Sequence, residues 1–141
     1  MAEGSIELTI VTPDKAVVHE QVDELQIPGS QGYFGVLPGH APLFSELKIG
    51  EVSYRKGSKW VHLALAWGFV EVLPNEVRIL AETAERAADI DVSRAKRAKE
   101  RAEARLSGAG DGVDYTRALV ALQRAILRIE VSEKSRESVG S

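Results

Sequence analysis

The fold of this 141-residue chain is decided by residues 28–42, Pro28-Gly29-Ser30-Gln31-Gly32-Tyr33-Phe34-Gly35-Val36-Leu37-Pro38-Gly39-His40-Ala41-Pro42. The stretch combines four glycines with three prolines. Glycine supplies backbone angles that other residues resist, and proline fixes φ and removes a hydrogen-bond donor. A disordered linker would not need Tyr33, Phe34, Val36 and Leu37, which are unusually apolar for a surface segment. The stretch therefore predicts tight turns that flank one short strand, and its apolar residues make it a candidate protein interface.

The sequence around this stretch predicts a β-sandwich over residues 1–84. Ile6, Leu8 and Ile10 alternate with polar residues, which is the period of a half-buried strand. Turn residues separate further short apolar segments, as in sandwiches and barrels. Besides the first strand and the one inside residues 28–42, we expect strands at 17–22, 24–27, 49–54, 60–66, 68–73 and 76–80.

The composition changes at about residue 83, and residues 85–134 are expected to form a helical hairpin. Asp91 to Leu106 is dense in Ala, Arg, Lys and Glu, which favour helices. Three glycines within residues 107–112 interrupt the pattern, and a second helix is expected from Val113 or Asp114 to about Glu133. Two helices joined by a short glycine-rich connection fold back on each other. Residues 135–141 are expected to be a flexible tail.

Charge and composition exclude several functional classes. The net charge is -3, but residues 1–84 carry 6 Lys+Arg against 11 Asp+Glu, whereas residues 85–141 carry 12 against 10. This balance lacks the strong basic footprint of a nucleic-acid-binding protein. The chain has no cysteine, and its histidines, His19, His40 and His62, lack the spacing of a metal site. No phosphate-binding loop or nucleophile elbow is present, so we do not expect an enzyme.

Arginines recur with the same spacing on both predicted helices. The spacing of seven and then four residues places three arginines near one line on each helix. They are Arg94, Arg101 and Arg105 on the first helix and Arg117, Arg124 and Arg128 on the second. The arginines can be solvated or paired with Glu100 and Glu103 on an amphipathic surface. Alternatively, two such rows can form an anion clamp, because guanidinium groups bind phosphate oxygens in a bidentate manner.

Beside the arginines run two apolar stripes. Ala95, Ala98 and Ala102 form a small-residue stripe on the first helix. The second helix has a larger stripe, roughly opposite its arginines, made of Leu119, Leu122, Ile126 and Ile129. A helix pair joined partly through alanine should be marginally stable, because a buried alanine removes little apolar area from water.

Residues 28–42 resemble the signature loop of the epsilon subunit of the rotary, proton-translocating F-type ATP synthase. The resemblance continues through Gly68-Phe69-Val70-Glu71-Val72 and the β-then-αα order of the chain. It implies an α+β fold, with an antiparallel sandwich of about ten strands followed by a two-helix hairpin. It also implies a non-catalytic rotor subunit that couples proton translocation to ATP synthesis. The implied partners are the gamma subunit, the membrane c-ring and, with helices extended, the alpha/beta head, where the helices inhibit ATP hydrolysis.

The same resemblance carries over to individual residues. Gln31, Tyr33 and His40 are implied to touch the c-ring, although the family often has an acidic residue where Tyr33 stands. The segment Ile90-Asp91-Val92-Ser93-Arg94-Ala95 matches the Ile/Leu-Asp-x-x-Arg-Ala motif of epsilon subunits that bind ATP as a regulatory ligand. ATP would then be a regulator and not a required cofactor. The implied ATP-binding residues are Glu85, Asp91, Arg94, Arg101, Arg124 and Arg128.

Simpler interpretations exist for two of these residues, and one alternative exists for the whole chain. Asp91 also suits the N-cap of the first helix, and His40 is either a pH switch or a loop histidine bonded to local backbone. The chain as a whole could instead be a free-standing β-sandwich module that senses nucleotides or binds a small ligand. The resemblance to the epsilon subunit favours a peripheral location on the cytoplasmic face of the bacterial inner membrane.

Overall fold

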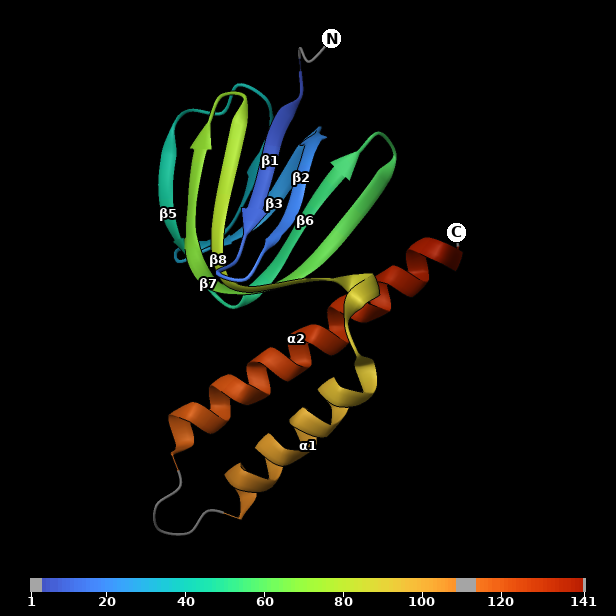
Figure 1. Ribbon diagram of the computed structural model, residues 1–141. Coiled ribbons are helices and arrows are strands. Elements are labelled where there is room, and N and C mark those ends of the chain that lie inside the picture. The colour runs from blue at the N-terminus through green and yellow to red at the C-terminus, as the bar shows by residue number, and fades with distance from the viewer. Residues whose placement is uncertain (1–3, 109–113, 141) are drawn as a thin grey trace. The chain divides into compact units, whose positions relative to one another are not determined.

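The computed structural model describes residues 4–108 and 114–140, with side chains as far as Lys134. The chain divides into two compact units, Met1–Arg86 and Ala87–Ser141. The first unit is built of strands and the second of helices, so the expected α+β class is confirmed (Figure 1). The division falls two residues after the expected boundary at residue 84, because the last strand continues to Arg86.

Within residues 4–86 the structure has eight strands. They are β1 (Ile6–Val11), β2 (Ala16–Val22), β3 (Glu24–Gly29), β4 (Gly32–Val36), β5 (Leu43–Leu47), β6 (Gly50–Lys56), β7 (Lys59–Leu73) and β8 (Glu76–Arg86). The alternation that predicted β1 is borne out, since Ile6, Leu8 and Ile10 are buried while their neighbours are half-buried. The core between the layers is made of such inward-facing residues from all eight strands.

Hydrogen bonding arranges the strands into the two layers of a sandwich. One layer contains β2, β1, the start of β8, the end of β7 and β5. The other contains β4, β3, β6, the start of β7 and the end of β8. β1 and β8 run parallel, so the expected antiparallel arrangement is wrong for this pair. These two strands are separated by most of the domain, and no hairpin forces them to run in opposite directions.

β7 accounts for one strand of the difference between the expected number of about ten and the observed eight. Residues 60–66 and 68–73 were expected to form two strands, but they form one strand that leaves β6 and joins β5 at Trp67 and Gly68. Gly68 has a φ of +150°, and a Cβ added there would lie 1.9 Å from the carbonyl oxygen of Leu80. Only glycine allows β7 and β8 to approach this closely. β5 occupies a segment in which no strand was predicted from the sequence.

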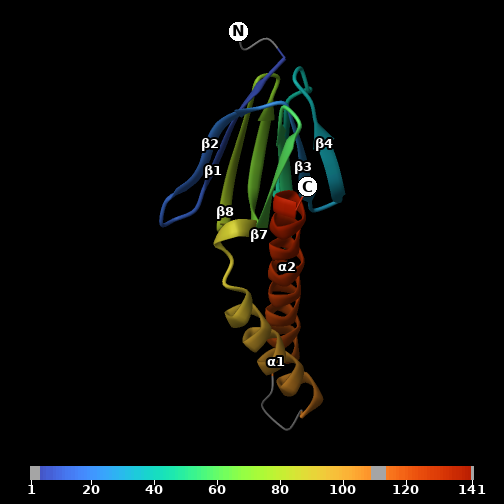
Figure 2. The same ribbon diagram turned by 90° about the vertical axis from the view of Figure 1, so that its right-hand side faces the viewer.

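The second unit contains a short 3-10 helix, η1 (Ala87–Asp89), and two long helices, α1 (Val92–Ser107) and α2 (Tyr115–Gly140). The long helices lie side by side in both views (Figures 1 and 2). Asp91 caps α1 by accepting a hydrogen bond from the Arg94 backbone N–H at 3.0 Å. Asp114 does the same for the Arg117 N–H at 3.0 Å. The expected hairpin is therefore confirmed.

The expected end of the second helix is wrong. α2 continues past Glu133 to Gly140, through most of the segment that was expected to be a flexible tail. That segment contains the helix-forming residues Arg136 and Glu137 and no proline, so the sequence has no stop signal before Gly140. Ser141, Val113 and most of the glycine-rich connection, the other positions named in the expectation, lie outside the described residues.

Candidate interaction surfaces and ligand sites

Residues 28–42 form the hairpin of β3 and β4 and the loop that follows it, as expected. Gly29 pairs with Gly32 across a two-residue turn, which places Gln31 exposed at the tip. Tyr33 is 60% exposed, and its hydroxyl oxygen accepts a 2.8 Å hydrogen bond from the Glu51 backbone N–H on β6. A Cβ at Gly50 would lie 2.7 Å from that hydroxyl, so the glycine makes room for it. The tyrosine is thus held against β6 and still offers its ring to a partner.

The expected apolar surface on this loop is only half correct. Tyr33 and Leu37 are exposed, but Val36 is buried and Phe34 packs against the core. The alternation of β4 turns Phe34 and Val36 inward and leaves Tyr33 outside. His40 is half-buried, and its Nδ1 atom lies 2.6 Å from the carbonyl oxygen of Ala41. This contact favours the interpretation of His40 as a loop histidine bonded to local backbone.

A larger apolar surface, which was not predicted from the sequence, lies on the outer side of β5, β7 and β8. We call it the apolar face, and it consists of Phe44, Trp67, Phe69 and Leu80, with exposed fractions of 68%, 37%, 45% and 58%. Phe69 pairs with Leu80 across β7 and β8, and its ring stacks on Phe44 with centroids 5.7 Å apart. An open groove of about 540 Å³ continues the face past Trp67 to Val11 and Pro13.

One sequence signal for this face was available. In the last part of β7, after Gly68, Val70 and Val72 are buried. Phe69 therefore points outward, as Glu71 does. An apolar residue in a polar register is the sign of an exposed hydrophobic position. The sequence could not predict that Phe44 lies next to Phe69, because the pairing of β5 with β7 joins residues far apart in the chain.

The six predicted ATP-binding residues are divided between the two units. Glu85 lies on β8 in the first unit, and the other five lie in the second. Arg94 and Arg101 are exposed on α1, whereas Arg124 and Arg128 are half-buried on α2. Asp91 has the N-cap geometry described above. Because α1 packs on α2, the arginines of both helices lie in the same compact unit.

Alanines occupy the buried positions of α1 and two of those of α2. Ala95 and Ala102 are the buried residues of α1, and α2 buries Ala118 and Ala125 with the same spacing of seven, besides Val131 and Ser132 further along the helix. Ala98 of the predicted small-residue stripe is half-buried. The larger stripe of α2 is only partly covered, because Leu119 and Ile126 are exposed, as is Tyr115 one turn before Leu119.

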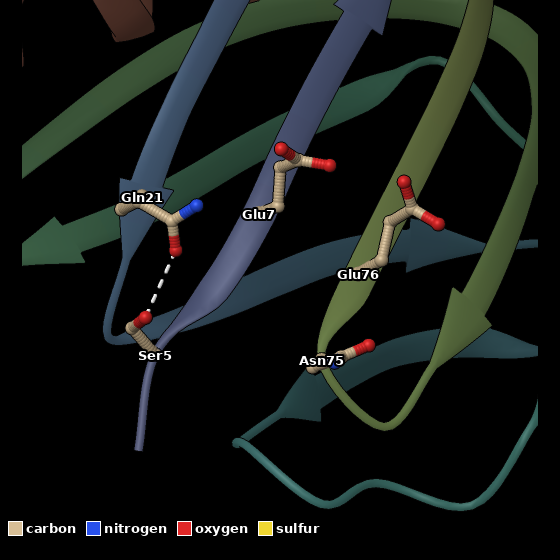
Figure 3. Close-up of a pocket in the computed structure, with 5 residues that line it drawn as sticks. All are labelled: Ser5, Glu7, Gln21, Asn75 and Glu76. Atoms are coloured by element: carbon tan, nitrogen blue, oxygen red, sulfur yellow. Dashed lines mark hydrogen bonds between the residues drawn. The ribbon is translucent and has the colours of Figure 1, made fainter. Parts of the chain in front are cut away.

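A polar pocket of about 310 Å³ opens near the N-terminal end of β1 (Figure 3). Glu7 and Glu76 are register partners on β1 and β8, and their carboxylates project from neighbouring strands. Ser5 donates a 2.9 Å hydrogen bond to the side-chain oxygen of Gln21, and Asn75 completes the lining. Among the described residues no group of three or more His, Cys, Asp or Glu side chains could hold a metal ion.

A partly buried hydroxyl–carboxylate pair ties β6 to β2 inside the sandwich unit. The Tyr54 hydroxyl donates a short hydrogen bond to Glu20, and the Lys56 ammonium lies 3.1 Å from the other oxygen of the same carboxylate. The Tyr54 hydrogen bond is the main cause that lowers the pKa of Glu20, with Lys56 adding to it. Burial of the ring, and then Glu20, raises the pKa of Tyr54 well above its usual range. Tyr54 is fully buried, so this pair is structural.

Comparison with known proteins identifies the family of the chain. Residues 5–87 match the family described as "ATP synthase, Delta/Epsilon chain, beta-sandwich domain", and residues 88–133 match its "long alpha-helix domain". The chain is 53% identical over 135 residues to the ATP synthase epsilon chain of Syntrophobacter fumaroxidans, covering 96% of this chain and 100% of the relative. It is 52% identical over 129 residues to that of Nitratidesulfovibrio vulgaris strain DP4, covering 92% of this chain and 96% of the relative.

A solved structure has the same fold. It is a chain of the Euglena gracilis mitochondrial ATP synthase, in an assembly of OSCP, F1 and c-ring, with a TM-score of 0.68 and 23% identity over 96% of this chain and 81% of that one. No helix among the described residues is both long and apolar enough to cross a membrane. Epsilon chains are non-catalytic subunits of the synthase. The chain therefore belongs to the ATP synthase delta/epsilon family, as an epsilon-type chain.

Proposed function

We propose that this chain is a rotor subunit of the central stalk, which couples proton translocation to ATP synthesis and restrains ATP hydrolysis through its helices. In this proposal the sandwich unit binds the gamma subunit and rests on the c-ring at the cytoplasmic face of the membrane. The observation that carries the proposal is the apolar face of the sandwich, together with the epsilon-type sequence over both units.

The apolar face has the composition of a protein-binding surface. Three aromatic side chains and a leucine are exposed on neighbouring strands, and monomeric proteins seldom leave such a surface uncovered. Exposed charged side chains lie beside it, from Glu46, Glu71, Glu82 and Arg78, so the carboxylates outnumber the guanidinium, and residues 1–84 carry an excess of five negative charges. A partner that covers this face therefore needs an apolar centre and basic residues at its rim. We assign this role to the gamma subunit.

The β3–β4 hairpin is the proposed contact with the c-ring. Gln31 stands at the tip of the turn, Tyr33 is held against β6, and His40 lies on the loop that follows β4. Residues on a loop that a rigid sheet supports are well placed to contact a partner. Since Tyr33 carries no charge, the contact that it makes is aromatic and hydrogen-bonding.

The helical unit is the proposed brake on hydrolysis. Its alanine contact buries little apolar area, at about 25 cal/mol per Å², so opening should cost only a few kcal/mol, within the range that ligands and partners can shift. An opened hairpin would add the half-buried Leu122 and Ile129 to the exposed part of the larger stripe. It would present this stripe and the arginine rows to the gamma subunit and the alpha/beta head. ATP held between the arginines of the closed pair would oppose that opening.

Co-elution with gamma tests the main proposal. The full-length chain should co-elute with the purified gamma subunit of the same synthase in size-exclusion chromatography. Phe69→Asp should abolish this complex, because it places a charge at the centre of the apolar face, whereas Leu37→Asp, on an exposed residue outside the face, should not. A folded wild-type chain that elutes alone would refute the stalk assignment and favour a free-standing binding module.

Calorimetric titration with ATP tests the nucleotide proposal separately. The wild-type chain should release heat on binding, and Arg94→Ala should lose it. Arg97→Ala is the matched control, because Arg97 is also exposed on α1 but lies outside the motif. Equal heats for the wild type and the Arg94 variant would remove ATP from the proposal and leave the stalk assignment intact.

A further inference from the structure

Trp67 has a backbone conformation that tryptophan normally avoids. Its φ is +47°, and among the described residues it is the one non-glycine with positive φ. For a bulky side chain the left-handed region is sterically unfavourable, and such residues persist only where the surrounding structure enforces them. A glycine at this position would adopt the same angle without strain.

The surroundings of Trp67 explain how the angle is maintained. Residues on either side of it are paired with β8, Ala66 with Thr83 and Gly68 with Ala81. The Trp67 backbone N–H donates a 3.3 Å hydrogen bond to the carbonyl oxygen of Lys48, at the point where β7 changes its partner from β6 to β5. The corner in β7 thus requires the angle at residue 67, but nothing in this backbone arrangement requires an indole.

The position of the indole supplies a reason for the tryptophan. Trp67 is 37% exposed, adjoins Phe69 in sequence and lines the groove that runs to Val11 and Pro13. Its ring therefore extends the apolar face beyond Phe69 and Leu80. Tryptophan is among the residues that contribute most to binding when a partner excludes water around it. Glycine would meet the backbone requirement of this corner without strain, so the presence of an exposed tryptophan here points to a role of its ring in binding.

We propose that Trp67 is an affinity-determining residue of the apolar face and inserts its indole into an apolar pocket of the partner, whose rim is basic. The inference rests on the proposed function, because it takes gamma as that partner. It goes further by assigning the strained corner of β7 to recognition: the sandwich tolerates an unfavourable angle in order to present this ring.

The test compares Trp67→Gly and Trp67→Ala in the full-length chain. Both variants lose the indole, but only alanine keeps a Cβ in the left-handed conformation. The glycine variant should therefore melt at a higher temperature than the alanine variant. Both should bind gamma at least about tenfold more weakly than the wild type by surface plasmon resonance. A third variant, Trp60→Phe, leaves Trp67 as the one tryptophan, and its emission should shift to shorter wavelength when gamma binds.

The outcomes separate this inference from the proposed function. If the wild type binds gamma while both Trp67 variants bind within twofold of it, the inference is overturned and the stalk assignment stands. An unchanged emission spectrum in the saturated Trp60→Phe complex would overturn it equally. Absence of wild-type binding would remove both. Equal melting temperatures of the glycine and alanine variants would remove the argument from strain.

Discussion

The hydrogen bond between Tyr54 and Glu20 gives the sharpest test of how the sandwich is stabilised. In Tyr54→Phe the buried ring remains but the donor to the Glu20 carboxylate is lost. The carboxylate keeps its contact with the Lys56 ammonium at 3.1 Å, so the charge stays partly compensated. The substitution therefore isolates one hydrogen bond to a charged acceptor, with little change in packing.

The expected loss follows from that geometry. A hydrogen bond to a charged group contributes about 1.5–3 kcal/mol, and the remaining Lys56 contact places the expected loss near 2 kcal/mol. For a domain of 60–100 residues, each kcal/mol shifts the melting temperature by about 4–8 °C, so Tyr54→Phe should lower it by about 8–16 °C. Glu20→Gln and the double variant complete a cycle that measures the coupling between the two side chains.

Tryptophan fluorescence is a suitable assay, because Trp60 and Trp67 both lie in the sandwich unit and report its unfolding alone. Tyr115→Phe is the control, since Tyr115 is exposed on α2 and its loss should leave the fluorescence transition unchanged. If Tyr54→Phe melted together with the wild type at neutral pH, the assignment of this pair as a stabilising contact would be wrong.

The pH dependence provides a second check on the same pair. The pKa of Glu20 is lowered from 4.5 in the folded chain, so its contribution is complete above pH 4.5 and is lost as the pH falls through the folded pKa. The pKa of Tyr54 is raised from 10.0, so its contribution is complete below pH 10.0 and is lost as the pH rises further. The difference in stability between the wild type and Tyr54→Phe should therefore shrink at both extremes.

Two further substitutions test the corner of β7 and the helix contact. Gly68→Ala should destabilise the sandwich by more than about 3 kcal/mol, since its Cβ would meet the Leu80 carbonyl oxygen; Gly57→Ala, at φ +63° with no neighbour within 4 Å, should cost only about 1–2 kcal/mol by the same fluorescence assay. Ala102→Leu should lower the melting temperature of the helical unit in far-UV circular dichroism by overpacking worth about 1–3 kcal/mol. Ala104→Leu on the exposed side of α1 is its control, and equal effects of the two leucines would contradict an alanine contact.

Local patterns in the sequence predicted those elements that local interactions determine. The alternation of Ile6, Leu8 and Ile10 predicted β1, and the helix-forming composition after Asp91 predicted α1 together with its N-cap. Errors arose where a local signal had two meanings. Gly68 was taken as a boundary between strands, but it is the position that lets one strand turn a corner.

The features that could not be predicted depend on contacts between distant residues. The parallel pairing of β1 with β8 and the stacking of Phe44 on Phe69 both join segments that only the folded sheet brings together. Apolar residues in the 28–42 loop were expected at the surface, but the alternation of β4 directs Phe34 and Val36 into the core. The larger exposed apolar surface therefore lies on β5, β7 and β8, outside the stretch in which the sequence predicted one.

The passage of β7 and β8 through both layers has a mechanical consequence. In a sandwich whose strands each belong to one layer, only side-chain packing resists sliding of one layer over the other. Here two strands cross from layer to layer, β7 at the corner that Trp67 and Gly68 form and β8 beside it at Ala81 and Thr83, and they run side by side. A shearing load applied at Phe69, in the end of β7, is carried along the peptide bonds of this strand to its first part, which is paired with β6. The two layers therefore resist sliding and move together.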